Sequence, residues 1–441
     1  MRFMLTTLGC PKNVVDSEMM AELLREAGHQ PVAEAPEADV LIVNTCAFIA
    51  PARDESYAVL RELADGKRRG QFLVVAGCMA QRYGLALRRR VPEIDAVIGT
   101  RSWPQIAVLL AQLESGGRKA LPQALVREEA ELVASVRRRA ELGASAYLKI
   151  ADGCNASCAF CAIPGIKGPQ QSKPREAILR EARELADLGV RELLLIAQDT
   201  TAYGHDLGQA DALPGLLRDI VQAAPALEWV RVLYAYPQHV SQRLIDTMAE
   251  LPQVCHYFDL PLQHGHPDVL RRMRRPHDAS TVDDLLRRVR AAMPDVSLRT
   301  AFIVGYPGET EVEFEALLDL MRDEAFDKVG VFAYSREEGT AAARLPGRVP
   351  ARVVEERRER AMLLQQEISL ARNREQVGRE LPVLIEGVGE GVSVGRSYRD
   401  APEIDGVVLL AGEAPVGQFV RTRIVAAQEY DLIGEWLDAP A

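Results

Sequence analysis

The stretch KIADGCNASCAFCAIPG (residues 149–165) places three cysteines, Cys154, Cys158 and Cys161, in a single short segment. Three thiolates this close together can hold three irons of a four-iron cluster, whereas a cluster that only transfers electrons is normally closed by four cysteines. The fourth iron is then open to a small molecule. The spacing therefore predicts a 4Fe-4S cluster that takes part in chemistry.

Zinc and disulfide bonds are the alternative uses of these thiols. Structural zinc usually takes four ligands from paired short spacings, and no second Cys-x-x-Cys or His-x-x-x-His motif follows nearby. The N-terminus, MRFMLTTLGCPKN, has no basic segment followed by an apolar core, so we expect no signal peptide and a reducing, cytoplasmic location that disfavours disulfides. No apolar run reaches the roughly 18 residues of a membrane span, so no membrane is expected among the partners.

A second set of three cysteines lies in the first hundred residues. Apolar strand-like runs alternate there with helical patterns, at 2–9, 13–28, 40–45, 51–66, 72–77 and 96–99. This alternation is typical of a parallel α/β sheet. The first three strand-like runs lead into Cys10, Cys46 and Cys78, and the carboxyl ends of parallel strands share one edge of a sheet. We therefore expect these thiols to converge, although any one alone would more simply be a buried core cysteine.

Three helices have recognisable ends. The first is expected to be capped by Asn13 or Asp16 and to end at Gly28. A helix over 174–188 has proline at its first turn and glycine directly after it. A long charged helix is expected over 351–378.

The pattern divides the chain into four segments. Residues 1–116 form an N-terminal parallel α/β sheet domain, and the charged stretch 117–143 is a linker. Residues 144–373 contain six strand-helix repeats, which predict a partial (β/α)6 barrel of the TIM-like kind with the cysteine motif at its C-terminal mouth. Residues 374–441 alternate short apolar runs with turns and predict a small antiparallel β-barrel resembling a TRAM domain.

The charge argues against a protein that coats nucleic acid. The whole chain has a formal net charge of -10. From Arg374 to the end there are six Arg, no Lys and twelve Asp plus Glu, a net charge of -6. Phosphate binding draws mainly on clustered Lys and Arg, so the terminal segment does not suit a polyanion.

The cysteine motif at the mouth of a partial barrel resembles the radical S-adenosylmethionine superfamily. Together with TLGCPKNVVDSE (7–18), VNTCAF (43–48) and AGCMAQ (76–81), it makes the chain similar to the methylthiotransferase family over essentially its whole length. The resemblance implies that Cys154, Cys158 and Cys161 hold a 4Fe-4S cluster that binds S-adenosylmethionine and releases a 5′-deoxyadenosyl radical. It also implies that Cys10, Cys46 and Cys78 hold a second 4Fe-4S cluster, which carries the sulfur.

Members of this family modify either a tRNA adenosine or a protein. The stretches AQDTTAYG (197–204), DLPLQHGHP (259–267), FIVGYPGET (302–310) and GRSYRDAPEIDG (395–406) resemble the protein-modifying branch. That resemblance implies insertion of a methylthio group at the β-carbon of an aspartate in small-subunit ribosomal protein twelve, free or on the ribosome, giving 3-methylthioaspartate. An electron donor and a sulfur donor are implied as further partners. A tRNA adenosine methylthiotransferase and a non-catalytic iron-sulfur adaptor for RNA or the ribosome are the alternatives.

Candidate residues beyond the six cysteines are few. Gln198, Arg299 and Gly305 lie at or near the ends of predicted barrel strands and are expected to contact S-adenosylmethionine, with a structural role as the alternative for each. No catalytic residue is expected beyond the cluster ligands. Lys167 stands where the family commonly has arginine, which puts bidentate contacts there in doubt, and Cys255 is expected to be a buried core thiol.

Overall fold

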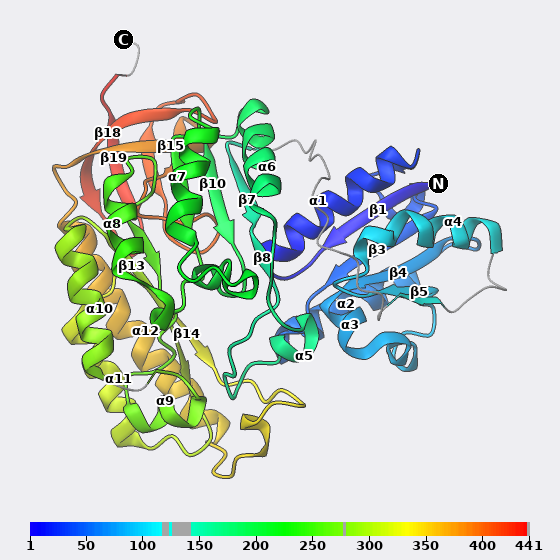
Figure 1. Cartoon of the computed structure of the whole chain (residues 1–441), viewed down its shortest axis with the longest axis horizontal. Coiled ribbons are helices and arrows are strands. Elements are labelled where there is room, and N and C mark those ends of the chain that lie inside the picture. Colours follow the sequence, from blue (N-terminus) through cyan, green and yellow to red (C-terminus); the bar gives the residue numbers. More distant parts are fainter. Residues whose placement is uncertain (117–122, 126–142, 277–278, 439–441) are drawn as a thin grey trace. The chain divides into compact units, whose positions relative to one another are not determined.

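The computed structural model describes residues 1–116, 123–125, 143–276 and 279–438 (Figure 1), so nearly all of the predicted linker 117–143 lies outside the described residues. The described chain forms two compact units. The first comprises the described residues within Met1–Glu141, together with Tyr147–Glu184 and Ser335–Ala343. The second comprises the described residues within Leu142–Ala146, Leu185–Tyr334 and Arg344–Ala441.

The N-terminal sheet is parallel throughout, as predicted. Its strand order is β2-β1-β3-β4-β5-β6. The strands are β1 (Arg2–Thr7), β2 (Gln30–Pro31), β3 (Val40–Thr45), β4 (Phe72–Gly77), β5 (Ala96–Ile98) and β6 (Gln123–Leu125). The helices are α1 (Pro11–Glu26), α2 (Ala50–Asp65), α3 (Cys78–Tyr83) and α4 (Ile106–Gly116). Every residue of β3 is buried, which suits a central parallel strand covered on both faces.

The first unit also contains the segment with the cysteine motif. Strand β7 (Ser145–Lys149) leads into β8 (Ala151–Asp152), which pairs antiparallel with β9 (Gln171–Ser172). The cysteine loop and α5 (Ile163–Lys167) lie between β8 and β9, and α6 (Arg175–Asp187) follows. The helix predicted over 174–188 is therefore confirmed to within one residue at each end.

The second unit carries the remaining strands of the partial barrel, which we call the half-barrel and which begins with β7. They are β10 (Glu192–Ile196), β11 (Trp229–Val232), β12 (Tyr257–Asp259), β13 (Ser297–Val304) and β14 (Lys328–Ala333). The helices are α7 (Leu213–Ala223), α8 (Gln242–Glu250), α9 (Pro267–Met273), α10 (Ala279–Ala292), α11 (Glu311–Glu324) and α12 (Ala351–Arg374). The strands form two sheets, β11-β10-β7 and β12-β13-β14, and a parallel bridge between Val230 and Val254 leads from one to the other. The partial barrel is confirmed, and α12 ends four residues before the predicted end.

The terminal strands close into a small barrel, shown in orange and red in Figure 1. They are β15 (Glu380–Gly389), β16 (Val392–Arg396), β17 (Val408–Ala411), β18 (Phe419–Ala427) and β19 (Leu432–Trp436). All neighbours pair antiparallel except β17 and β19, which pair parallel and complete the ring. Alternate buried residues such as Leu381, Val383 and Ile385 fill its core.

The stretch 395–406 joins this small barrel to the half-barrel through buried charges, and we refer to it as the clamp loop. Four ion pairs of 2.5–3.4 Å cross between them: Arg396–Glu192, Arg399–Asp327, Asp400–Lys328 and Asp405–Arg299. Burial raises the pKa of Glu192, but Arg231 and Arg396 outweigh it and bring that pKa down to about 2. The clamp loop therefore has an architectural role that its sequence did not reveal.

None of the helices in the described ranges combines the length and the apolar character that crossing a bilayer requires.

Candidate active site

The first cysteine triad forms at the carboxyl edge of the N-terminal sheet. Strands β1, β3 and β4 are neighbours, with Thr7 opposite Asn44 and Thr45 opposite Gly77. Cys46 and Cys78 each follow their strand by one residue, and Cys10 follows β1 after a short turn. The topology therefore brings the ends of the three cysteine-bearing strands together, as predicted. We call Cys10, Cys46 and Cys78 the upstream triad.

A buried amide network joins the strand ends beneath the upstream triad. The Asn13 side chain donates to the carbonyls of Leu8 at 2.8 Å and Thr45 at 3.1 Å, and Asn44 donates to the Asn13 carbonyl at 2.9 Å.

The prediction that Asn13 or Asp16 caps α1 is wrong, because the helix begins at Pro11, where no N–H needs a partner, and Cys10 occupies the N-cap position. The predicted end is confirmed, since α1 stops two residues before Gly28.

Burial sets the acidity of the upstream triad. Cys46 and Cys78 are buried, and Cys10 is half-buried. Burial raises the pKa of Cys78 to about 12, the Lys167 ammonium opposes that rise, and the Cys10 and Cys46 thiols add to it. Burial also raises the pKa of Cys46. The three thiols thus lie within electrostatic reach of one another, and iron must displace their protons to bind.

The second triad, which we call the loop triad, lies in one turn of chain between β8 and α5. Cys154, Cys158 and Cys161 are all half-buried. Gly153 has φ +80°, and a Cβ there would lie 2.1 Å from the Pro169 carbonyl oxygen, so only glycine fits at the start of the loop. The amides of Ala156 and Ile163 donate to the sulfurs of Cys154 and Cys161, each at 3.4 Å. Such N–H donors suit metal-bound thiolates and tune clusters.

None of the seven cysteines, all of which lie in the described residues, forms a disulfide bond. Within the described chain, the one group of three ligand atoms lying within 4.8 Å of each other is His266, Asp268 and Glu313. Two of its carboxylates already bind arginines and not a metal ion: Arg272 donates two hydrogen bonds to Glu313, and Arg271 forms an ion pair with Asp268. Within the described chain neither cysteine triad forms such a group.

Buried charges connect the elements that carry the two triads. Lys149 of β7 pairs with Asp16 of α1 and lies 3.6 Å from Asp152 of β8. Lys167 of α5 lies 3.0 Å from Asp152 and 3.5 Å from Asp16. The Lys167 ammonium therefore makes separate contacts with the two carboxylates. The bidentate pair that an arginine could form is absent at this position, as expected for a lysine. Sequence reasoning missed this tetrad because Asp16 and Lys149 are 133 residues apart.

The segment Ser335–Ala343 completes the first unit through Glu337. The buried Glu337 carboxylate accepts hydrogen bonds from Arg53 and, at 2.7 Å, from Arg82. Arg82 also donates to the carbonyl of Ala47, next to Cys46, at 2.9 Å. At the other end of the segment, the amide of Ala342 donates to the carbonyl of Ala159, inside the loop triad, at 2.8 Å. No sequence pattern signalled this connection.

The predicted S-adenosylmethionine contacts all lie in the second unit. Gln198 follows β10 and is half-buried. Arg299 binds Asp259 at 2.8 Å and Asp405 at 3.4 Å, and although burial opposes its charge, these partners raise its pKa. A Cβ on Gly305 would lie 2.4 Å from a methyl group of Val354, so this glycine lets α12 approach. Structural roles thus account for Arg299 and Gly305, and cofactor contact stays a prediction for all three.

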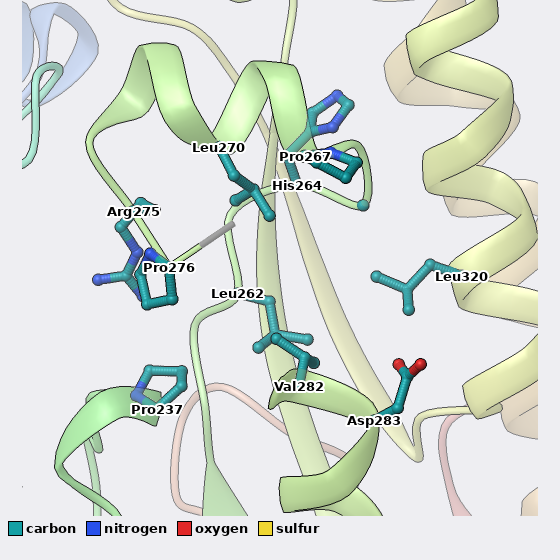
Figure 2. A pocket seen from close by; sticks show the side chains of 11 residues that line it. Pro237, Leu262, His264, Pro267, Leu270, Arg275, Pro276, Val282, Asp283 and Leu320 are labelled. Carbon is teal, nitrogen blue, oxygen red and sulfur yellow. The ribbon is translucent and has the colours of Figure 1, made fainter. Parts of the chain in front are cut away.

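Figure 2 shows a small cavity in the second unit, with Leu262, Leu270, Val282 and Leu320 among its lining side chains. Its volume is about 30 Å³, which has room for a water molecule and not for a nucleoside. His264 at its edge accepts a hydrogen bond from the His266 amide at 3.0 Å. This cavity is therefore not a cofactor pocket.

Three family models match the chain: the uncharacterized protein family UPF0004 over residues 2–99, the radical SAM superfamily over 148–321, and the TRAM domain over 377–437. Among solved structures, the radical S-adenosylmethionine methyltransferase TsrM from Kitasatospora setae has a TM-score of 0.59. The match covers 89% of this chain and 77% of that one at 14% identity, which supports the fold. Fold and cysteine motif together define a radical S-adenosylmethionine enzyme.

Curated relatives narrow this class. A protein of Roseiflexus sp. (strain RS-1) named ribosomal protein uS12 methylthiotransferase RimO is 50% identical, over 100% of this chain and 98% of its own length. A protein of the same name from Chloroflexus aurantiacus is 50% identical, over 99% of this chain and 100% of its own. The chain belongs to the RimO family of radical S-adenosylmethionine methylthiotransferases. Membership implies a 4Fe-4S cluster and S-adenosylmethionine, and the three thiols of the loop triad, with N–H donors beside two of them, fit that cluster.

Proposed function

We propose that this enzyme inserts a methylthio group at the β-carbon of an aspartate in ribosomal protein uS12, giving 3-methylthioaspartate, and that it uses two 4Fe-4S clusters to do so. The loop triad would hold the first cluster and the upstream triad the second. We also propose the domain division of 1–116, 144–373 and 374–441 around the linker 117–143. An electron donor and a sulfur donor must be supplied from outside the chain.

The observation that carries the two-cluster proposal is the presence of two incomplete cysteine sets in one compact unit. Replacing an unactivated C–H bond by C–S requires a strong hydrogen abstractor and, within reach, a sulfur atom that accepts a carbon radical. When bound, the clusters and S-adenosylmethionine supply that radical and that sulfur. Each triad leaves one iron of its cluster without a cysteine, so the chain has donors for two open sites.

The protein's own residues supply position and surroundings. Gly153 and the amides of Ala156 and Ile163 fix the loop triad and donate toward its sulfurs. The burial of Cys46 and Cys78 shields two of the three thiols of the upstream triad from water. Glu337 accepts a hydrogen bond from Arg82, which also donates to the backbone beside Cys46. The segment that contains Glu337 is hydrogen-bonded to the backbone of the loop triad at its other end.

The choice of a protein substrate is supported by the relatives' names and by charge. On the terminal barrel the carboxylates of Glu390 and Glu413 are exposed and form no ion pair with another residue of the described chain. They lie at one end of the barrel, because the Gly412 amide donates to the Gly391 carbonyl at 2.8 Å. Negative charge there attracts a basic ribosomal protein and repels tRNA.

Anaerobic reconstitution followed by mass spectrometry tests the proposal. With two clusters, we expect about eight irons per chain and 5′-deoxyadenosine on addition of S-adenosylmethionine and reductant. Incubation with uS12 and, separately, with tRNA should add one methylthio group to an aspartate of uS12 alone. About four irons per chain would contradict the second cluster, and a gain on tRNA alone would contradict the substrate.

A further inference from the structure

Helix α5 connects the two triads directly. It begins two residues after Cys161 and ends at Lys167. Its N-cap residue Ala162 and its buried Ile166 belong to the same apolar cluster as Cys78. The position of Lys167 is therefore set by the loop triad before the helix and by packing in the cluster that contains Cys78.

Lys167 is buried and held at a definite place. Only 2% of its side chain is exposed, and its ammonium contacts Asp152 at 3.0 Å and Asp16 at 3.5 Å. Burial works against its charge, but Asp152, Asp16 and Cys78 outweigh burial and raise its pKa. Lys167 therefore carries its positive charge throughout the pH range in which the enzyme works.

That charge acts on the upstream triad. Helix α5 packs against α3, which begins at Cys78. Burial raises the pKa of Cys78, and the Lys167 ammonium at the end of α5 opposes that rise. The tetrad of Lys149, Lys167, Asp16 and Asp152 has no net formal charge, so removal of Lys167 would leave a net negative charge in the elements beside Cys78. The cluster proposed there would gain a negative charge on one-electron reduction, and a nearby cation stabilises that state.

We propose that Lys167 sets the reduction potential of the upstream cluster and holds it above the value that the buried sulfurs alone would give. This inference rests on the proposed second cluster. In the step concerned, one electron from an external reductant enters the oxidised cluster and no bond is formed or broken. Lys167 is thus a tuning residue and takes no part in the reaction itself.

The test uses the full-length chain with C154A, C158A and C161A, in which only the upstream cluster can assemble. Iron content is measured first, and the reduced fraction is then followed by EPR in a potentiometric titration. In this background K167M should lower the reduced-to-oxidised ratio at the parent's midpoint at least about tenfold, a shift of about 59 mV for one electron. K167R keeps the charge and should change the ratio less than about threefold, a shift of under half that size.

Two further variants separate tuning from general damage. K173M removes another buried lysine of the first unit, paired with Glu181, and should leave the midpoint unchanged. K167M with D152N removes one charge of each sign from the tetrad. It should therefore bind iron where K167M fails, and its midpoint should lie between that of K167M and that of the parent. The inference would be overturned if K167M had the parent's midpoint at equal iron content, or if K173M shifted the midpoint as much as K167M does. It would also be overturned if K167M and K167M with D152N both lost iron while K167R kept it. Absence of iron in the triple-cysteine parent would instead contradict the second cluster.

Discussion

The upstream triad and the loop triad present the same donor atoms in very different surroundings. Cys10, Cys46 and Cys78 come from three strand ends, and two of them are buried, whereas Cys154, Cys158 and Cys161 come from one loop and are all half-buried. The geometry of the upstream triad depends on the whole sheet, and that of the loop triad on a single turn. One compact unit thus contains one set of three thiols near solvent and another set that is mostly buried.

The largest effect should come from removing one ligand of each triad. Cys158→Ala should abolish both 5′-deoxyadenosine formation and methylthiolation, each by at least about a thousandfold. Cys46→Ala should abolish methylthiolation to the same extent but leave 5′-deoxyadenosine formation measurable. Both products are quantified by mass spectrometry on reconstituted protein. If Cys46→Ala still methylthiolates uS12, the upstream triad is not the sulfur site.

Alkylation of the metal-free protein should separate the triads by reactivity. The half-buried thiols of the loop triad should react with iodoacetamide at least about a hundredfold faster than Cys78, because the thiolate is the reactive form and burial raises the pKa of Cys78 to about 12. Below that pKa the Cys78 rate should rise about tenfold per pH unit. Cys255, whose pKa burial also raises to about 12, serves as the internal control. Peptide mass spectrometry over pH 7–10 measures each site; equal rates would contradict the difference in shielding.

Glu337→Gln tests whether the two triads are held together by the segment Ser335–Ala343. Arg53 and Arg82 would lose their buried carboxylate, which should cost about 3 kcal/mol in the free energy of unfolding. Methylthiolation should fall about tenfold with 5′-deoxyadenosine formation largely kept, since the link through Arg82 is the one weakened.

Glu338→Gln is the matched control, because its side chain is exposed, and it should change stability by less than about 0.5 kcal/mol. Denaturant unfolding and product assays measure both variants. Equal losses of both products in Glu337→Gln would mean that Glu337 stabilises the unit without coordinating the triads.

The smallest effect should come from the surface of the terminal barrel. Glu413→Lys should raise KM for uS12 about threefold at low salt, with kcat unchanged, because it removes attraction for a basic substrate. The difference should shrink at high salt. Glu367→Lys makes the same charge change at an exposed position of α12 and should leave KM unchanged. A KM that does not move in Glu413→Lys would exclude this end of the barrel from uS12 binding.

Sequence patterns predicted the elements better than the contacts between them. Apolar periodicity located the half-barrel strands, and local spacing was enough for the loop triad because Cys154, Cys158 and Cys161 share one turn. The upstream triad was also predictable, since parallel topology forces neighbouring strand ends together. The cap of α1 was mispredicted because Asn13, a good capping residue by type, is used instead for tertiary hydrogen bonds to Leu8 and Thr45.

What could not be predicted depends on pairs of side chains far apart in the sequence. Lys167 and Asp16 meet only because α5 and α1 pack in one unit, and Glu337 reaches Arg82 across 255 residues. The ion pairs of Arg299 with Asp259 and Asp405 were likewise not visible in the sequence, and its contact with S-adenosylmethionine stays a prediction. Burial and pairing of charges arise from the fold and leave no local pattern.

The clamp loop also has a consequence for how the chain matures during synthesis. Glu192 and Asp327 emerge from the ribosome long before Arg396 and Arg399, their partners near the C-terminus. Until those arginines arrive, Glu192 has Arg231 and Asp327 has Arg372 as counterion, so each buried carboxylate is only partly paired, which costs free energy. The half-barrel therefore gains its full set of buried ion pairs only after Arg396 and Arg399 have been synthesised.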